Sequence, residues 1–346
     1  MVILKFLILI IIFFTLNIPL FAQTFSIKGQ SWASALTNND VPIGQSSLEY
    51  NIGYIPTFSL NKTLLDNYLI DMELSFQLNR TYSGASLINN TEIFYRYWVR
   101  YSSNTLEARL GLQKVSFGPA RVLRTLSWFD TINLRDPTGQ THGVEAFRLR
   151  WFPSNVFSLW SWMMTNDQNN FSYGGRGELS TKLGEWGFTY HKDLSKSLQM
   201  IGQSSIPVSD PHYRLAIDYR YDGFIGMWNE SAMIKSENLN INMVTIGADY
   251  TLPILNGIQL MTETLYISTK PNLFTLPRTF SAFMASLPLG ILHNVMLISS
   301  VDWDENNIYN YLRWNTTFDS FSINCMASIN PKEMGNSIQF MFIYNH

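Results

Sequence analysis

Apolar and polar residues alternate one by one over long stretches of this chain. Between residues 68 and 78 one set of alternate positions holds Tyr68, Ile70, Met72, Leu74, Phe76 and Leu78, and the other holds mostly polar side chains such as Asp71 and Gln77. Successive side chains of a β-strand point to opposite faces of a sheet. This alternation therefore predicts a strand with one apolar face and one polar face. The pattern returns at 93–101 and 213–222, where arginines occupy the polar positions.

Eighteen segments of the chain have strand character. They are 25–35, 46–58, 67–79, 91–102, 105–115, 143–152, 155–165, 174–182, 185–192, 211–222, 226–237, 241–252, 257–268, 279–287, 291–301, 307–318, 319–329 and 336–345. Polar connections such as 153–155 and 182–185 predict short turns between them. Some of the eighteen segments are expected to be loops rather than strands, and no change in composition marks a second domain.

Alternation alone does not distinguish a soluble β-protein from a membrane barrel. In a soluble protein the apolar face is buried, whereas in an outer-membrane barrel it contacts lipid and the polar face lines an aqueous interior. The N-terminus favours export, because Lys5 precedes an apolar run from Phe6 to Phe14, and Asn17 and Pro19 interrupt the run before Ala22. This arrangement predicts a secretory signal peptide over residues 1–22, with cleavage after Ala22. A transmembrane helix is the alternative interpretation of the run.

Composition agrees with a barrel in the outer membrane. Charged residues make up 14% of the chain and aromatic residues another 14%, whereas ordinary soluble domains contain about 25% charged residues. The mean hydropathy of -0.02 is far below that of a helical membrane protein. A formal net charge of -2 gives no support for nucleic-acid binding. The single cysteine, Cys325, allows neither a disulfide framework nor an N-terminal lipid anchor.

These observations predict an all-β fold, a single transmembrane antiparallel β-barrel that spans residues 23–346. Barrels made by one bacterial chain contain an even number of strands, and we expect about 16, with 14 and 18 as neighbouring possibilities. The expected location is the outer membrane of a Gram-negative bacterium, in contact with outer-membrane lipid.

Near the C-terminus Phe340, Phe342 and Tyr344 alternate with other residues, so the chain ends inside a strand. This end resembles the signal by which barrel-assembly machinery recognises its clients, although the final aromatic residue stands two positions early.

One long segment, residues 116–141, does not alternate and is rich in Gly, Pro, Arg and Asp. Its length is unusual for a connection between strands, which favours a loop that folds into the barrel and constricts it. The preceding Gly111 to Gly118, then Trp128 to Asp130, Asp136-Pro137, Gly143-Val144 and Phe147 to Arg150, resemble alginate-export-type and related porin-like outer-membrane barrels. The resemblance covers about 40 residues around 108–152, and Leu112 stands where that pattern commonly has Arg. It implies passive transport through a polar interior.

Arginines are the main candidate functional residues. The expected pore-lining set is Arg96, Arg100, Arg109, Arg121, Arg124, Arg135, Arg148, Arg150, Arg214 and Arg220. Guanidinium groups in a narrow aqueous passage bind carboxylates and phosphates and raise the local concentration of anions. The alternative is structural, because carboxylates in the same strand phase could pair with the arginines across neighbouring strands. Asp130 and Asp136 are expected to order the turns of the loop by accepting backbone hydrogen bonds.

The sequence also offers weaker signs of three other functions. Asp210-Pro211-His212 superficially matches the acid and histidine of a barrel protease, and His142 or His293 could serve a barrel phospholipase, but five histidines make such coincidences common. We therefore expect no enzymatic activity, no cofactor and no metal site, because no ligand spacing for a metal occurs. A non-conducting barrel that acts as a scaffold for a protein partner remains the main alternative to a channel for small hydrophilic solutes.

Overall fold

The structure is a computed structural model that describes residues 23–41, 46–64, 67–165, 170–196, 198–201, 206–270, 277–331 and 334–346. The expected signal peptide, residues 1–22, lies outside the described residues. The described residues fold into β-strands joined by turns and loops. No helix in this part of the chain is long and apolar enough to cross a membrane.

The described part of the chain contains twenty strands joined by turns and loops. They are β1 (Gln23–Asn38), β2 (Leu48–Leu64), β3 (Tyr68–Ser83), β4 (Ser86–Ser102), β5 (Leu106–Gln113), β6 (Val144–Ser154), β7 (Phe157–Thr165), β8 (Phe171–Thr181), β9 (Gly184–Asp193), β10 (Gln199–Ile201), β11 (Ile206–Val208), β12 (His212–Asp222), β13 (Gly226–Ser236), β14 (Asn240–Leu252), β15 (Ile258–Lys270), β16 (Arg278–Leu289), β17 (His293–Asp302), β18 (Asn307–Thr317), β19 (Phe321–Ile329) and β20 (Ser337–Asn345).

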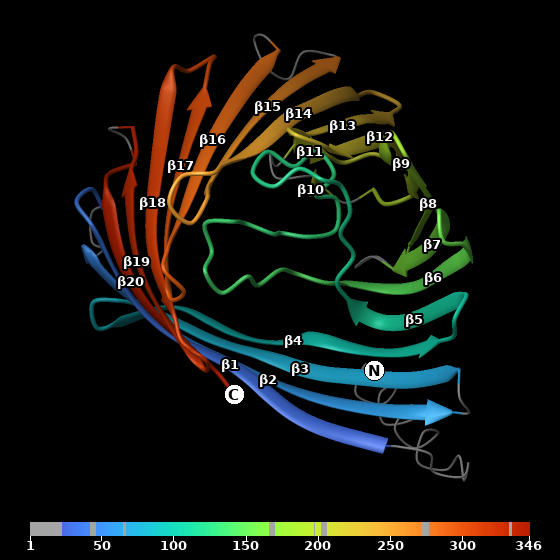
Figure 1. The fold of residues 1–346 in the computed structure, drawn as a ribbon, viewed down its shortest axis with the longest axis horizontal. Coiled ribbons are helices and arrows are strands. Elements are labelled where there is room, and N and C mark those ends of the chain that lie inside the picture. Colours follow the sequence, from blue (N-terminus) through green and yellow to red (C-terminus); the bar gives the residue numbers. More distant parts are fainter. Residues whose placement is uncertain are drawn as a thin grey trace.

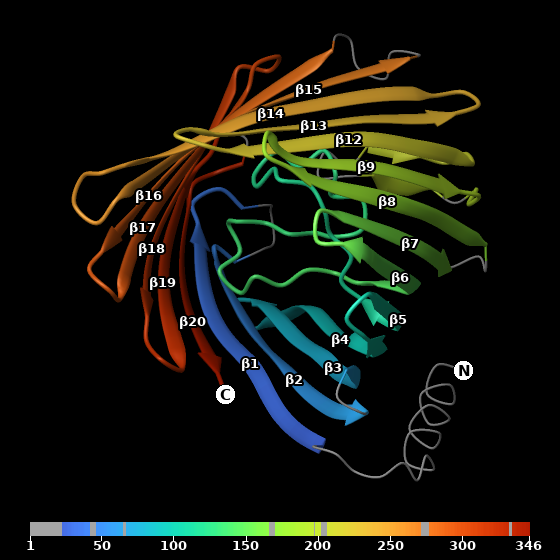
Figure 2. The ribbon, with the colours of Figure 1, turned by 45° about the vertical axis from the view of Figure 1, so that its right-hand side comes forward.

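Eighteen of these strands form one closed antiparallel barrel (Figures 1 and 2). Each strand pairs with its neighbours in the chain, β9 pairs with β12, and β1 closes the barrel by pairing with both β2 and β20. The prediction of an all-β antiparallel barrel is confirmed, but the barrel has eighteen strands, the upper of the two neighbouring possibilities, rather than about 16. All eighteen segments that alternate in the sequence pair on both sides, because an unpaired strand would leave backbone groups without partners in lipid.

The two ends of the barrel differ in their connections. Short turns, including those after β6 and β8, lie at the end where β1 begins and β20 ends. The opposite end carries the longer connections, among them residues 114–143 between β5 and β6. The small β10–β11 hairpin belongs to the connection between β9 and β12. Its Ile206 and Val208 side chains are buried in an apolar cluster with residues from several wall strands, so this connection also contributes to the filling of the barrel.

The outer face of the barrel is an apolar band. Phe147, Trp151 and Phe340 are 44%, 48% and 57% exposed on this face. On β3 the outward positions are apolar from Tyr68 to Leu78, and ten residue steps at about 3.3 Å along a tilted strand span roughly 25 Å of height. That height matches the apolar band of outer-membrane barrels.

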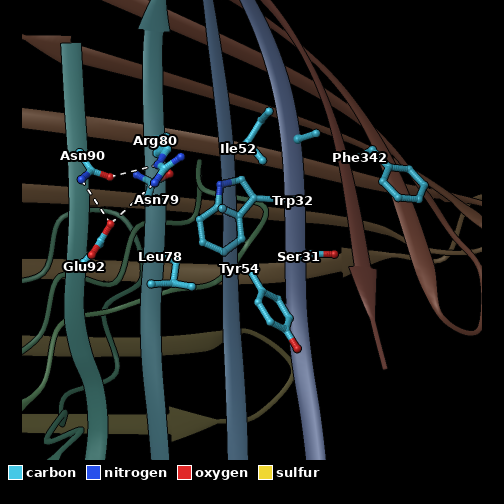
Figure 3. A pocket seen from close by; sticks show the side chains of 12 residues that line it. Ser31, Trp32, Ile52, Tyr54, Leu78, Asn79, Arg80, Asn90, Glu92 and Phe342 are labelled. Carbon is cyan, nitrogen blue, oxygen red and sulfur yellow. Dashed lines mark hydrogen bonds and ion pairs between the residues drawn. The ribbon is translucent and has the colours of Figure 1, made fainter. Parts of the chain in front are cut away.

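Polar side chains begin directly beyond this band. Figure 3 shows Arg80, Asn90 and Glu92 on neighbouring strands β3 and β4, with the Nε of Arg80 donating to the Oδ1 of Asn90 at 3.3 Å. Beside them lies a hollow of about 490 Å³, which forms because the small Ser31 and Ala33 lie between taller side chains of β2 and β20. The change from apolar to charged residues marks one edge of the expected membrane-facing surface.

A β-bulge changes the strand phase in β4. Ser75 lies opposite Arg96, but the next residue of β3, Phe76, lies opposite Phe94, so Tyr95 is an extra residue without a cross-strand partner. Ile93 is consequently opposite Gln77, whose amide bonds to the internal Gln140 at 3.1 Å. The alternation placed Ile93 and Tyr95 on the lipid-facing side; the bulge instead directs Ile93 to the interior, and the hydroxyl of Tyr95 accepts a hydrogen bond from the internal Thr141.

Candidate functional site

Residues 114–143, which we call the internal loop, lie inside the barrel and hydrogen-bond to its wall (Figure 1). Two buried carboxylates hold one side of the loop. Glu263 of β15 accepts hydrogen bonds from the backbone N–H groups of Arg121, Val122 and Leu123 at 2.7, 2.8 and 2.7 Å. Glu230 of β13 accepts from two further loop N–H groups, those of residues 120 and 126, both at 2.9 Å. These five hydrogen bonds fix this side of the loop to the wall.

The opposite side of the loop contacts other strands. The hydroxyl of Tyr311 on β18 donates to the carbonyl oxygen of Arg135 at 2.7 Å. The guanidinium of Arg96 on β4 donates to the carbonyl oxygen of Thr141 at 2.6 Å. The amide of Gln140 donates to Gln30 on β1 at 3.2 Å. The internal loop therefore crosses the barrel and contacts widely separated parts of its wall.

Much of the barrel interior is apolar where the loop packs against the wall. Phe117 and Trp128 of the loop belong to one buried cluster with inward side chains of β6, β7 and β13–β15, and the rings of Phe117 and Trp162 stack at 5.9 Å. Ala120 and Val122 belong to a second buried cluster with β1, β2, β13 and β15–β20. The interior is therefore narrowed by a packed apolar region as well as by polar side chains.

A row of arginines crosses the wall from β4 to β6. Arg100 lies directly opposite Arg109, and Arg109 lies directly opposite Arg148. Like charges at opposed positions destabilise a sheet unless carboxylates compensate them. Glu107 lies within 2.7 Å of Arg148, 3.5 Å of Arg100 and 3.7 Å of Arg109, and Asp71 binds Arg100 through both oxygens at 2.6 and 2.8 Å.

Carboxylates do not balance this arginine row completely. From β3 to β6, among the described residues, five arginines and three carboxylates face the interior: Arg96, Arg100, Arg109, Arg148, Arg150, Asp71, Glu73 and Glu107. Aromatic rings support two of the guanidinium groups, because Arg109 lies over Trp98 at 4.4 Å and Arg150 over Trp160 at 3.9 Å. The buried Nε atoms of both have no hydrogen-bond partner among the described residues. This region of the interior carries an excess of positive charge.

Three predicted loop arginines have different surroundings. Arg124 is buried and paired with Asp130 within the loop, at 3.1 Å between Nη2 and Oδ2. Arg121 is 4.0 Å from Asp249 of β14, and its side chain is 36% exposed. Arg135 donates to the hydroxyl of Ser300 on β17 at 3.0 Å. The arrangement makes Arg124 part of the loop's internal packing, whereas the other two reach the wall.

The remaining predicted residues lie elsewhere. Arg214 is buried and donates to the Nε2 of His212 at 3.1 Å, and Arg220 binds Asp222 at 2.7 Å at the short-turn end of the barrel. Asp136 accepts hydrogen bonds from the backbone and hydroxyl of Thr138, at 2.9 and 2.7 Å, and so closes a turn. The structure thus brings together the arginines of β4–β6, but Arg214 and Arg220 lie on β12, in a different part of the barrel wall.

Two residues that organise the interior, Arg176 and Glu230, were not singled out from the sequence, whereas Asp218 and Glu263 belong to the polar-phase carboxylates that were expected to pair with arginines. Arg176 of β8 binds Asp218 of β12 at 2.6 and 2.9 Å, and Glu230 and Glu263 hold the internal loop. Each of these residues lies in the inward phase of a predicted strand, and this phase was the available signal. The strand phase alone could not single out these polar residues as interior ones, because β13 and β15 also carry apolar side chains on their inward faces.

The histidines named for hydrolases make other contacts in the structure. The Nδ1 of His212 contacts the backbone carbonyl of Asp210 at 2.9 Å, and the Asp210 carboxylate accepts from Asn238 at 3.2 Å. His293 contacts the hydroxyl of Thr316 at 2.9 Å. No group of three or more His, Cys, Asp or Glu residues in the described segments is arranged to hold a metal ion.

Comparison with known proteins identifies the fold. No family model matches the sequence, and no curated relative matches it. Among solved structures, the chain is similar to OmpT, an outer membrane protein of Vibrio cholerae, with 10% identity, a TM-score of 0.55, and coverage of 94% of this chain and 100% of that one. It is also similar to a mutant porin of Rh. blastica, with 9% identity, a TM-score of 0.54, and coverage of 93% and 100%. The chain therefore has the fold of a porin-like outer-membrane β-barrel, while membership of the alginate-export-type family is not confirmed.

Proposed function

We propose that this protein is an outer-membrane channel for passive diffusion of small hydrophilic solutes, with a preference for anions. It lies in the outer membrane of a Gram-negative cell, is inserted there by the barrel-assembly machinery, and catalyses no reaction. The fold supports a channel, and the resemblance of residues 108–152 to alginate-export-type barrels supports the same class of function. The internal loop, including 116–141, acts as the constriction.

The observation that carries the preference for anions is the excess of arginines on β4–β6. Arg100, Arg109 and Arg148 lie side by side, and they share the carboxylates of Asp71 and Glu107. Arg150 adds a further guanidinium over Trp160. Fixed positive charge in a narrow passage lowers the energy of anions and raises that of cations, and added salt screens the effect.

Reversal potentials in a salt gradient across a planar bilayer test this proposal. The wild type is expected to pass anions in preference to cations. The double variant Arg109→Gln/Arg150→Gln should reduce that preference at least twofold, because it removes two charges while it leaves the Arg100–Asp71 and Arg148–Glu107 pairs in place. Arg80→Gln, on the outer face, is the matched control. Equal permeability of both ions in the wild type would refute the anionic preference.

The alternative function is that of a non-conducting barrel that serves as a scaffold for a protein partner. The two apolar clusters inside the barrel favour it, because the internal loop packs into both. Stepwise conductance of the refolded protein supports the channel. Complete absence of conductance, with the barrel shown to be folded, supports the scaffold and overturns the proposed function.

A further inference from the structure

A small pocket lies inside the barrel between the internal loop and strands β15–β17. It has a volume of about 280 Å³ and is lined by described residues only. Its apolar wall includes Val122, Leu123, Leu265, Ile267, Phe280 and Ile298. The volume lies just below the roughly 300–1,000 Å³ that is typical of ligand pockets, which limits an occupant to one ring or a short chain.

One side of this pocket carries a positive charge that lacks an acidic partner. Arg135 lines the pocket, and its guanidinium donates to the Oγ of Ser300 at 3.0 Å. Among the described residues no carboxylate is ion-paired with Arg135. The pKa of Arg135 is lowered overall, because the effect of burial exceeds that of the neighbouring Tyr311, which raises it. An arginine nevertheless stays protonated near neutral pH. A half-buried cation without a counter-ion is energetically unfavourable, and an anionic ligand would relieve this cost.

The second arginine of the pocket provides the contrast. Arg278 of β16 is paired with Asp302, and its Nη2 also lies 3.0 Å from the Oε1 of Glu305. Two carboxylates therefore already neutralise Arg278. Within the pocket, the donors of Arg135 are consequently the ones available to a carboxylate, and Ser300 occupies one of them.

We infer that this pocket binds a small amphipathic monocarboxylate, with the carboxylate on Arg135 and the apolar part against Phe280, Ile267 and Leu265. The inference rests on the proposed function and deepens it, because it names a class of solute that would bind inside the channel. Planar guanidinium groups bind carboxylates through two parallel hydrogen bonds. The apolar wall adds affinity for a ring or short chain that a simple inorganic anion lacks.

Calorimetric titration of the refolded barrel in detergent at low salt tests this inference, with benzoate as the probe. Benzyl alcohol has the same ring without the charge, and acetate has the charge without the ring. We expect benzoate to bind at least tenfold more tightly than either. Arg135→Gln should weaken benzoate at least tenfold and leave benzyl alcohol within threefold, because glutamine retains a donor for Ser300 but not the charge.

Two further variants test whether a loss of benzoate binding reflects the pocket itself or a general loss of folded structure. Arg121→Gln changes another loop arginine that lies outside the pocket and should leave benzoate binding within threefold. Phe280→Ser should weaken benzoate and benzyl alcohol alike. Equal binding of benzoate and benzyl alcohol, no binding of benzoate, or a normal benzoate affinity in Arg135→Gln would overturn the inference. A barrel that conducts ions without binding benzoate would refute only the pocket, and one that binds benzoate without conducting would refute only the channel.

Discussion

Individual side chains on the two faces of a strand should differ sharply in their tolerance of charge. Leu74 lies in the middle of the outward apolar set of β3, whereas Gln77 faces the interior and contacts Gln140. Leu74→Arg should destabilise the barrel by about 2–4 kcal/mol, because it places a charge against lipid near the midplane. Gln77→Arg should cost much less. Denaturant titrations in lipid vesicles measure both, and equal losses would mean that the facing of β3 is misassigned.

The sequence predicted the facing of most residues but could not locate every partner. Ser75 belongs to the polar phase of β3, which predicts an interior residue that tolerates a charge, but it is 0% exposed opposite Arg96 and therefore leaves little room for a longer side chain. The bulge at Tyr95 adds one residue without any compositional sign, and so the phase of Ile93 could not be predicted. Pairs such as Arg176 and Asp218 depend on the register of separate strands, which alternation does not specify.

At the scale of a single element, the internal loop should depend on the buried carboxylate of Glu263. This carboxylate accepts three loop N–H groups and the indole N–H of Trp228 at 3.1 Å. Glu263→Gln removes the charge and presents an amide N–H to these donors, and each unmet buried donor costs about 1–3 kcal/mol. We expect faster proteolysis within residues 116–141 and noisier single-channel currents than in the wild type.

Glu237→Gln is the matched control for this change, because Glu237 is exposed in the connection between β13 and β14. It should leave proteolysis and current noise unaltered. If Glu263→Gln behaves like this control, the backbone contacts of Glu263 do not determine the position of the loop. The length and composition of the segment were enough to predict an internal loop. Its anchors were not predictable, because Glu230 lies 104 and 110 residues beyond the N–H groups that it binds, and Glu263 lies 140 to 142 residues beyond those that it binds.

At the scale of the whole barrel the sequence was most informative, although eighteen strands is the upper end of the predicted range around 16. The eighteen alternating segments correspond to the eighteen strands of the barrel, and one of them, residues 156–163, is apolar on both faces. Trp160 and Trp162 are inward-facing there, one beneath Arg150 and the other against Phe117. A strand with two apolar faces is therefore accounted for by the packed interior, which cannot be recognised from one strand alone.

The mature protein as a whole should begin at Gln23 and reside in the outer membrane. Its outer face is an apolar band, and such a surface is stable only in a membrane; the apolar run before Ala22 predicts export to reach that membrane. N-terminal sequencing should therefore find Gln23 first, in protein recovered from the outer-membrane fraction with a circular dichroism spectrum dominated by β-sheet. Ala22→Asp should accumulate as a slower-migrating precursor, because the cleavage site needs a small residue there, whereas Ala22→Ser should be processed normally. Recovery of folded protein from the soluble periplasm, or cleavage unaffected by the aspartate, would contradict this prediction.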